Sequence, residues 1–226
     1  MFAAWEVGVW KTLAAHIRPD LVVGASAGAL NGWAIAGGIS PEQLAEHWLD
    51  PSLTSIRFRR PEPLHDKARE LWSRFQPQIP FGLTVVEMPR LRVRLVRERE
   101  VTWHHLAATC AVPLFFPSVS IQGSSCVDGG LMGSLPIWAA EEMGASRVIA
   151  VNCLTQWPFR LVRTILPPRR CGPALRIFAV TPSKPLGSLR DAIRWSRSNV
   201  ERWIELGEHD GALALSNLGR AWSRPS

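Results

Sequence analysis

One serine stands where a catalytic nucleophile would be expected. It is the centre of Gly24-Ala25-Ser26-Ala27-Gly28, which directly follows the apolar run Leu21–Val23 and precedes a helical stretch of small residues. A serine on such a strand-to-helix turn needs glycines two positions to either side, because the backbone bends sharply and the strand and helix approach closely. The pattern favours nucleophilic catalysis by Ser26, and a structural turn of small residues is the alternative.

The helix that begins after Ser26 adds electrophilic assistance to this arrangement. The first N–H groups of a helix have no partner within the helix, and the positive end of its dipole lies there. The N–H of Ala27 is therefore expected to donate a hydrogen bond to the oxyanion that forms when Ser26 attacks a carbonyl.

A serine hydroxyl needs a base that accepts its proton, and the histidines are poorly placed for this role. His209, between Glu208 and Asp210, is the only one late in the chain, where an ordinary triad would have its histidine. His104 and His105 fall in a predicted helix, where an exposed or capping histidine is the commoner outcome. A histidine-dependent hydrolase that uses His209 is retained only as a minor alternative.

Asp128 is a better candidate for the base. It follows the extended segment Ser125–Val127 and precedes Gly129 and Gly130. Two glycines directly after an acid permit a tight turn and let other backbone approach the carboxylate. An aspartate with no role beyond forming the turn is the alternative.

The elements that must position these residues alternate between helix and strand. Apolar residues that recur about every four positions from Phe2 to Ile17 predict a helix at the start of the chain. Strands are expected at 21–23, 83–86, 91–96, 118–122, 125–127, 147–152 and 175–180, and further helices at 29–37, 41–49, 67–75, 102–110, 136–143 and 188–206. This alternation favours an α/β domain with a mostly parallel central sheet, formed by residues 1–226, in which 51–80 is a peripheral excursion and 211–226 a peripheral tail.

Composition excludes several classes of protein. The chain has 226 residues, 46% of them hydrophobic, which is typical of a globular domain and not of a disordered chain. No apolar run approaches the roughly 18 residues that a membrane-spanning helix needs. The four cysteines are far apart and show no ligand spacing, so neither a zinc site nor a dense disulfide framework is expected. The first residues show no secretory signal, which favours a cytoplasmic location.

Three motifs in a fixed order resemble the patatin-like phospholipase family. They are the pentapeptide around Ser26, the segment Ala108–Pro117 (Ala-Thr-Cys-Ala-Val-Pro-Leu-Phe-Phe-Pro), and Val127-Asp128-Gly129-Gly130-Leu131. The resemblance extends over nearly the whole chain. It implies a three-layer α/β/α sandwich and hydrolysis of lipid acyl esters by a Ser-Asp dyad without histidine, metal or cofactor. Carried over to matching positions, Ser26 is the nucleophile and Asp128 its base.

The sequence departs from the family pattern at its start. Family members carry a glycine-rich loop between a first strand and the first helix, and this loop supplies further oxyanion donors. Here Met1 is already expected to lie in the helix, so both that strand and that loop are missing from the sequence. Loss of one such donor typically slows catalysis by about 100-fold to 1,000-fold. The alternative expectation is therefore a catalytically impaired remnant of the fold that binds lipid or a partner without turnover.

Charge suggests which partners the chain meets. A net charge of +7, carried mostly by arginine, suits an anionic membrane surface or nucleic acid. No nucleic-acid motif is present, so we expect no nucleic-acid partner, and the family resemblance implies a lipid substrate. The last predicted helix mixes apolar residues with arginines, and we expect it either to contact an acidic membrane peripherally or simply to pack its apolar stripe on the sheet. Arginines in 57–60 and 167–170 are expected to be solvated, with phosphate contact as the alternative.

Overall fold

The structure is a computed structural model that describes residues 1–56, 60–132, 135–155, 169 and 171–223. Its helices are α1 (Ala3–Leu13), α2 (Ala27–Ala36), α3 (Pro41–Leu49), α4 (Glu62–Arg74), α5 (Trp103–Ala108), α6 (Ile137–Glu142), α8 (Leu189–Ile193) and α9 (Arg197–Ser223). Its strands are β1 (Val22–Gly24), β2 (Phe81–Met88), β3 (Arg92–Arg97), β4 (Val119–Ile121), β5 (Ser124–Asp128), β6 (Arg147–Val151) and β7 (Arg176–Val180). Short 3-10 helices cover Pro51–Ser55, Glu98–Glu100 and Gly129–Met132.

Within the described residues, β2 is the centre of a five-stranded sheet with the order β1-β2-β5-β4, in which β3 also pairs with β2. Strand β3 pairs with residues 82–87 of β2 and occupies one edge of that strand. Strand β1 pairs with residues 81–83 and β5 with residues 85–88, so both lie along the opposite edge of β2. β1 runs parallel to β2 and ends with Gly24 opposite Leu83, and β5 runs antiparallel and ends with Asp128 opposite Val85. The carboxyl ends of β1 and β5 therefore meet on one edge of the sheet.

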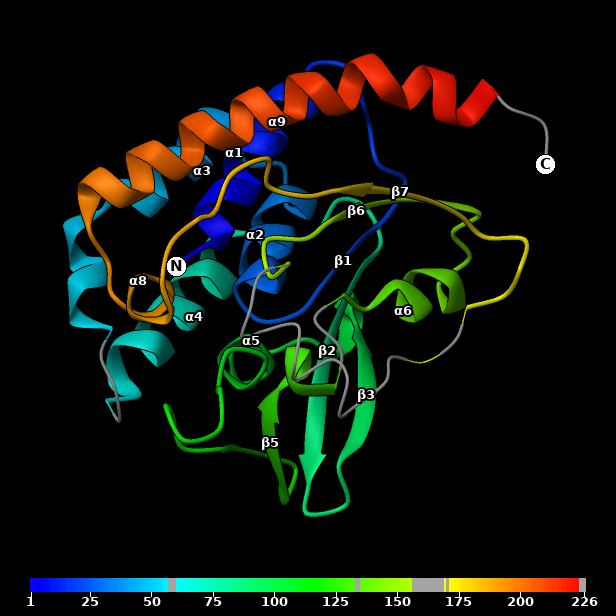
Figure 1. The fold of residues 1–226 in the computed structure, drawn as a ribbon. Coiled ribbons are helices and arrows are strands. Elements are labelled where there is room, and N and C mark those ends of the chain that lie inside the picture. The colour runs from blue at the N-terminus through cyan, green and yellow to red at the C-terminus, as the bar shows by residue number, and fades with distance from the viewer. Residues whose placement is uncertain (57–59, 133–134, 156–168, 170, 224–226) are drawn as a thin grey trace.

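Helices cover both faces of this sheet. A Cβ on Gly32 of α2 would lie 3.1 Å from the ring of Phe81, and one on Gly82 would lie 2.6 Å from the Met143 sulfur, just after α6. Successive side chains of a strand point to opposite faces, so α2 and α6 lie on opposite sides of β2. This is the three-layer α/β/α arrangement that the sequence predicts, and Figure 1 shows the sheet between the helices.

The pairing of the strands differs from the expectation of a mostly parallel sheet. In the five-stranded sheet β1–β2 is parallel, whereas β2–β3, β2–β5 and β4–β5 are antiparallel, so this sheet is mixed. Strands β6 and β7 form a separate, parallel two-stranded sheet. The β2–β3 and β4–β5 pairs are antiparallel because a short turn cannot join parallel strands. The β4–β5 connection consists of Gln122 and Gly123, both with positive φ, as a two-residue hairpin requires.

The end of the chain also differs from the expectation. Instead of one helix over 188–206, the structure has α8 and the long α9, which lies across α1 in Figure 1. α9 continues through Gly211, and Ala214 and Leu218 are buried. The predicted tail is therefore packed against the domain at least as far as Leu218. The cause is the apolar stripe of α9, which continues beyond residue 206, where we expected the helix to end.

Close backbone contact holds α1 and α9 together. A Cβ on Gly8 would lie 2.0 Å from the Ile204 carbonyl oxygen, and one on Gly207 would lie 2.1 Å from the Trp5 carbonyl oxygen. Trp5 Nε1 donates to Asp210 Oδ2 at 2.8 Å, so the crossing is also hydrogen-bonded. Trp5, Val7 and Val9 are completely buried, and α1 is therefore a central element of the hydrophobic core.

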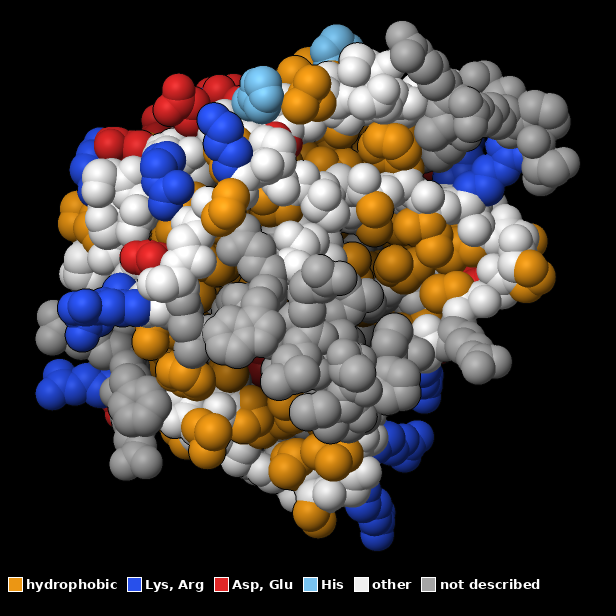
Figure 2. All heavy atoms as spheres, in the orientation of Figure 1, with side chains coloured by type: hydrophobic (Ala, Val, Ile, Leu, Met, Phe, Trp, Pro, Cys, Tyr) orange, Lys and Arg blue, Asp and Glu red, His pale blue; other side chains and the backbone are white. Residues whose placement is uncertain are grey.

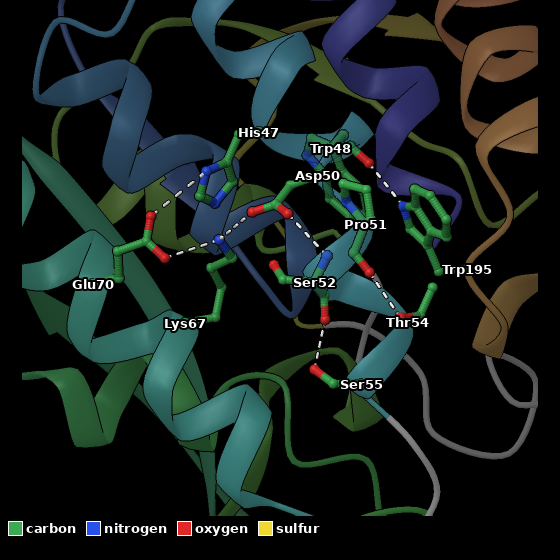
Figure 3. Close-up of polar contacts among 10 residues, drawn as sticks. All are labelled: His47, Trp48, Asp50, Pro51, Ser52, Thr54, Ser55, Lys67, Glu70 and Trp195. Atoms are coloured by element: carbon green, nitrogen blue, oxygen red, sulfur yellow. Dashed lines mark hydrogen bonds and ion pairs between the residues drawn. The ribbon is translucent and has the colours of Figure 1, made fainter.

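Residues 51–80 pack more closely than a peripheral excursion would. Ala68 and Leu71 of α4 are buried, and Trp33 Nε1 of α2 donates to the Leu71 carbonyl at 3.1 Å. Figure 3 shows how polar groups join α3 to α4: Lys67 Nζ lies 2.9 Å from Glu70 Oε2 and 3.6 Å from Asp50 Oδ2. Helix α4 therefore covers one side of the hydrophobic core.

Candidate active site

The backbone at Ser26 is bent as a nucleophile turn requires. Ser26 has φ 54° and ψ −139°, a combination that non-glycine residues rarely adopt and that costs of order 1–3 kcal/mol. Gly24 permits the sharp return of the chain, since a Cβ there would lie 2.6 Å from both Ala29 Cα and the Gly28 carbonyl oxygen. The turn between β1 and α2 therefore holds Ser26 in a strained conformation and requires glycine at Gly24.

The turn presents the hydroxyl of Ser26 to a carboxylate. Ser26 Oγ donates a hydrogen bond of 2.7 Å to Asp128 Oδ2, although the two residues are 102 positions apart. The topology explains the contact, because β1 and β5 end on the same edge of β2. The structure thus brings the two residues singled out in the sequence into direct contact.

Backbone groups fix the orientation of Asp128. The N–H of Gly130 donates to Asp128 Oδ1 at 2.6 Å, and the N–H of Asp128 donates to the Ala111 carbonyl at 3.1 Å. Gly129 is required here by close packing, because a Cβ on it would lie 1.9 Å from the Thr84 carbonyl oxygen of β2. The other carboxylate oxygen, Oδ2, is the one that accepts the hydrogen bond from Ser26.

Burial makes Asp128 more basic than an ordinary aspartate. The residue is 4% exposed, and this desolvation raises its pKa from 3.8 to about 6, against the opposing effect of the hydrogen bonds from Ser26 and Gly130. A carboxylate with a pKa closer to neutrality is a better proton acceptor at physiological pH. Asp128 is therefore ionised near pH 7 and still able to take up a proton.

Thr109 is a neighbour that sequence reasoning did not assign. Its hydroxyl accepts a hydrogen bond of 2.9 Å from the Ser26 N–H and donates one of 2.8 Å to the Thr84 carbonyl. Thr109 is completely buried and ties the strained turn to β2. It lies inside the Ala108–Pro117 motif, but only the folded chain shows that it contacts the serine.

Ala27 and Gly28 begin the helix that follows the serine. Ala27 is the first residue of α2, as the oxyanion prediction requires, and the Ala29 N–H donates to the Ser26 carbonyl at 2.9 Å. A Cβ on Gly28 would lie 3.3 Å from Glu6 Oε2 of α1, and the Glu6 carboxylate also accepts from Cys153 Sγ at 3.1 Å. The assignment of Ala27 as the oxyanion donor stays a prediction.

His104 and His105 contact residues of α5 and its cap. The ring nitrogen Nδ1 of His105 accepts from the Thr102 N–H at 3.1 Å and so caps α5, and burial lowers the pKa of this imidazole. His104 stacks on Trp103 at the start of the same helix, with ring centroids 3.7 Å apart. Among the described residues, no group of three or more His, Cys, Asp or Glu is arranged to hold a metal ion.

Most of the apolar stripe of the last predicted helix packs on the domain, whereas Ile193 is 43% exposed. Val200, Trp203 and Ile204 are buried, and Trp195 Nε1 donates to the Trp48 carbonyl at 2.9 Å, as Figure 3 shows. Packing on the domain, the alternative given for this helix, accounts for these residues. In the part of the chain that the structure describes, no helix is both long and apolar enough to cross a bilayer. Most of the arginine-containing segments 57–60 and 167–170 lies outside the described residues.

Comparisons with known proteins find a matching family and a similar fold. The family model described as patatin-like phospholipase matches residues 1–86 and 89–141, which include both Ser26 and Asp128. The crystal structure of VipD from Legionella pneumophila is similar, with a TM-score of 0.53 at 10% sequence identity. The alignment covers 96% of this chain and 65% of the VipD chain, so this chain spans about two thirds of its length. At this identity the likeness concerns the fold alone. A search of curated proteins finds no match.

Proposed function

Because the chain belongs to the patatin-like phospholipase family, we propose that it is a serine acyl hydrolase that cleaves fatty-acyl ester bonds of phospholipids or related lipids. The observation that carries the proposal is the 2.7 Å hydrogen bond from Ser26 Oγ to Asp128 Oδ2 at a strained strand-to-helix turn. In this proposal Ser26 is the nucleophile and Asp128 the general base.

The reaction proceeds through an acyl-enzyme. Asp128 accepts the proton of the Ser26 hydroxyl while Oγ attacks the ester carbonyl carbon, and the tetrahedral intermediate collapses as Asp128 returns that proton to the departing alcohol oxygen. Water then attacks the acyl-Ser26 carbonyl, with Asp128 accepting a proton from the water. Collapse of the second intermediate releases the fatty acid, and the proton passes to Ser26 Oγ.

The surroundings of the pair support this division of roles. The direct 2.7 Å contact removes the need for a relay through imidazole, and the Gly130 N–H holds the other carboxylate oxygen at 2.6 Å. The positive end of the α2 dipole favours the negative charge that develops on the carbonyl oxygen. We assign the Ala27 N–H as one donor to that oxyanion.

Hydrolysis of p-nitrophenyl esters by the purified chain tests the proposal. Ser26→Ala and Asp128→Asn are each expected to lower kcat/KM by about 100-fold to 10,000-fold, because one removes the nucleophile and the other its base. Matched controls are Ser120→Ala on the exposed part of β4 and Asp66→Asn, whose side chain is 72% exposed; both should keep the wild-type rate.

Two results would contradict the proposal. One is an unmodified chain that hydrolyses no ester of any acyl length. The other is an Asp128→Asn variant as active as the Asp66→Asn control, since the carboxylate in contact with Ser26 would then not be the base.

A further inference from the structure

The loop between α5 and β4 exposes its apolar residues. Leu114 is 86% exposed, the highest value among the exposed large hydrophobic side chains of the described residues, and Val112 is 37% exposed. Single exposed leucines are ordinary on protein surfaces, but few are exposed to this degree. In Figure 2, hydrophobic side chains gather at the lower left of the molecule, where Figure 1 draws the green segment after α5.

The backbone of this loop is unfavourable for a leucine. The Val112 carbonyl accepts hydrogen bonds from the N–H groups of Phe115 and Phe116 at 3.0 Å and 2.9 Å, which closes a tight turn with Pro113 and Leu114 at its tip. Leu114 has φ 73°, a value that glycine or asparagine adopts at this position of a turn with little strain. Both the conformation and the exposure of Leu114 are therefore costly in water, and such a residue points to a function.

The loop is directly connected to the candidate active site. The Ala111 carbonyl, one residue before the loop, accepts the hydrogen bond from the Asp128 N–H at 3.1 Å. After the loop the chain enters β4, where Val119 pairs with Cys126, two residues before Asp128 on β5. The exposed leucine is thus presented at the end of the sheet where Ser26 and Asp128 meet.

We propose that the loop Val112–Phe116 is an interfacial anchor that inserts Leu114 into the surface of a lipid bilayer and places the candidate active site against it. This inference rests on the proposed function, because an enzyme for fatty-acyl lipids must meet its substrate at a lipid–water interface. Insertion transfers the leucine from water to a hydrocarbon environment. The net charge of +7 favours bilayers that contain anionic lipids.

Binding to vesicles of ether-linked lipids tests the anchor without turnover, because these lipids contain no ester bond. Vesicles of ether-linked phosphatidylcholine with a minority of ether-linked phosphatidylglycerol are sedimented with the full chain. Leu114→Gly and Leu114→Asn are expected to lower the partition coefficient about tenfold, since each removes one apolar anchor. Both residues accept a positive φ, so the thermal unfolding midpoint should not fall below that of the wild type.

The matched control is Leu91→Gly. Leu91 also has a positive φ, 50°, and is 41% exposed, but it lies in the β2–β3 turn, at the end of β5 remote from Asp128. Leu91→Gly should bind vesicles like the wild type. Three results would overturn the proposal. The wild type does not bind the vesicles, the Leu114 variants bind like the wild type, or all three variants lose binding equally.

Light scattering on the wild type adds a second decisive readout. A monomer is expected. A dimer that Leu114→Gly dissociates would mean that a second copy of the chain covers the loop, and would overturn the proposal. Because none of these readouts uses hydrolysis, absence of esterase activity would count against the proposed function alone.

Discussion

At the scale of single residues, the pair of Ser26 and Asp128 links reactivity to stability. Burial raises the pKa of Asp128 from 3.8 to about 6, so the folded chain holds this proton more tightly than the unfolded chain does. Protonated Asp128 therefore stabilises the folded state relative to its ionised form. This contribution is complete below pH 3.8 and is lost as the pH rises through about 6. At neutral pH the ionised carboxylate therefore lowers the free energy of unfolding.

Asp128→Asn should consequently stabilise the protein while it abolishes activity. At about pH 7.5 the free energy of unfolding should rise by roughly 1–3 kcal/mol, and near pH 4 the gain should largely vanish, because the wild-type residue is then neutral. Urea unfolding at the two pH values measures both quantities. A variant that is equally or less stable than the wild type at the higher pH would disprove this link.

The same ionisation should appear in the rate. We expect kcat/KM for a neutral soluble ester to rise with pH and to reach half of its plateau near pH 6, because only the ionised form of Asp128 accepts a proton from Ser26. A pH series of initial rates provides the test. A profile that stays flat from about pH 5 to 7 would rule out Asp128 as the titrating base.

The sequence predicted the contacting pair but not all of its neighbours. Ser26 and Asp128 are recognisable because glycines lie two positions to either side of the serine and directly after the aspartate. Thr109 carries no such signal, since a threonine near the end of a helix is ordinary. Its contact with the Ser26 N–H depends on how α5 packs beside β2, which local spacing does not reveal.

At the scale of elements, the crossing of α1 and α9 depends on glycine. Gly8→Ala would place a Cβ 2.0 Å from the Ile204 carbonyl oxygen, and overpacking of this kind typically costs about 1–3 kcal/mol. Gly219→Ala, in the partner helix α9, is the control, because a Cβ there meets nothing within 4 Å. We expect the midpoint of thermal unfolding to fall by several degrees for Gly8→Ala only. Equal unfolding midpoints for the two variants would show that α1 and α9 can move apart at Gly8 without loss of stability.

Most elements follow from local patterns, whereas their pairing does not. The helix at Pro41–Leu49 has the capping box formed by Ser40 and Gln43 that its sequence indicates. The alternation of helices and strands correctly predicts the α/β layers. It does not predict the antiparallel pairs β2–β3 and β4–β5, which result from connections as short as Gln122-Gly123. The length of a turn is therefore a better guide to strand direction than the order of elements.

At the scale of the whole molecule, the second half of α9 is part of the folded domain. Trp5 donates to Asp210, and beyond it Ala214 and Leu218 are buried. A chain that ends after Asp210 should lose this packing. Burial of one leucine contributes about 1.5–3 kcal/mol, so thermal unfolding should begin several degrees lower.

Leu218→Ala tests the same packing without shortening the chain, and should destabilise by about 2–4 kcal/mol. Ser216→Ala, at an exposed position of the same helix, is the control. If neither the shortened chain nor Leu218→Ala lowers the midpoint of thermal unfolding, residues 211–226 are the peripheral tail that the sequence suggests.

Covalent labelling with a fluorophosphonate, followed by mass spectrometry of the peptides, tests the central claim most directly. We predict one adduct, on Ser26 Oγ, that forms faster as the pH rises through about 6 and is almost absent in Asp128→Asn. An adduct on another residue, or labelling of Ser26 at the same rate without the carboxylate, would contradict the account.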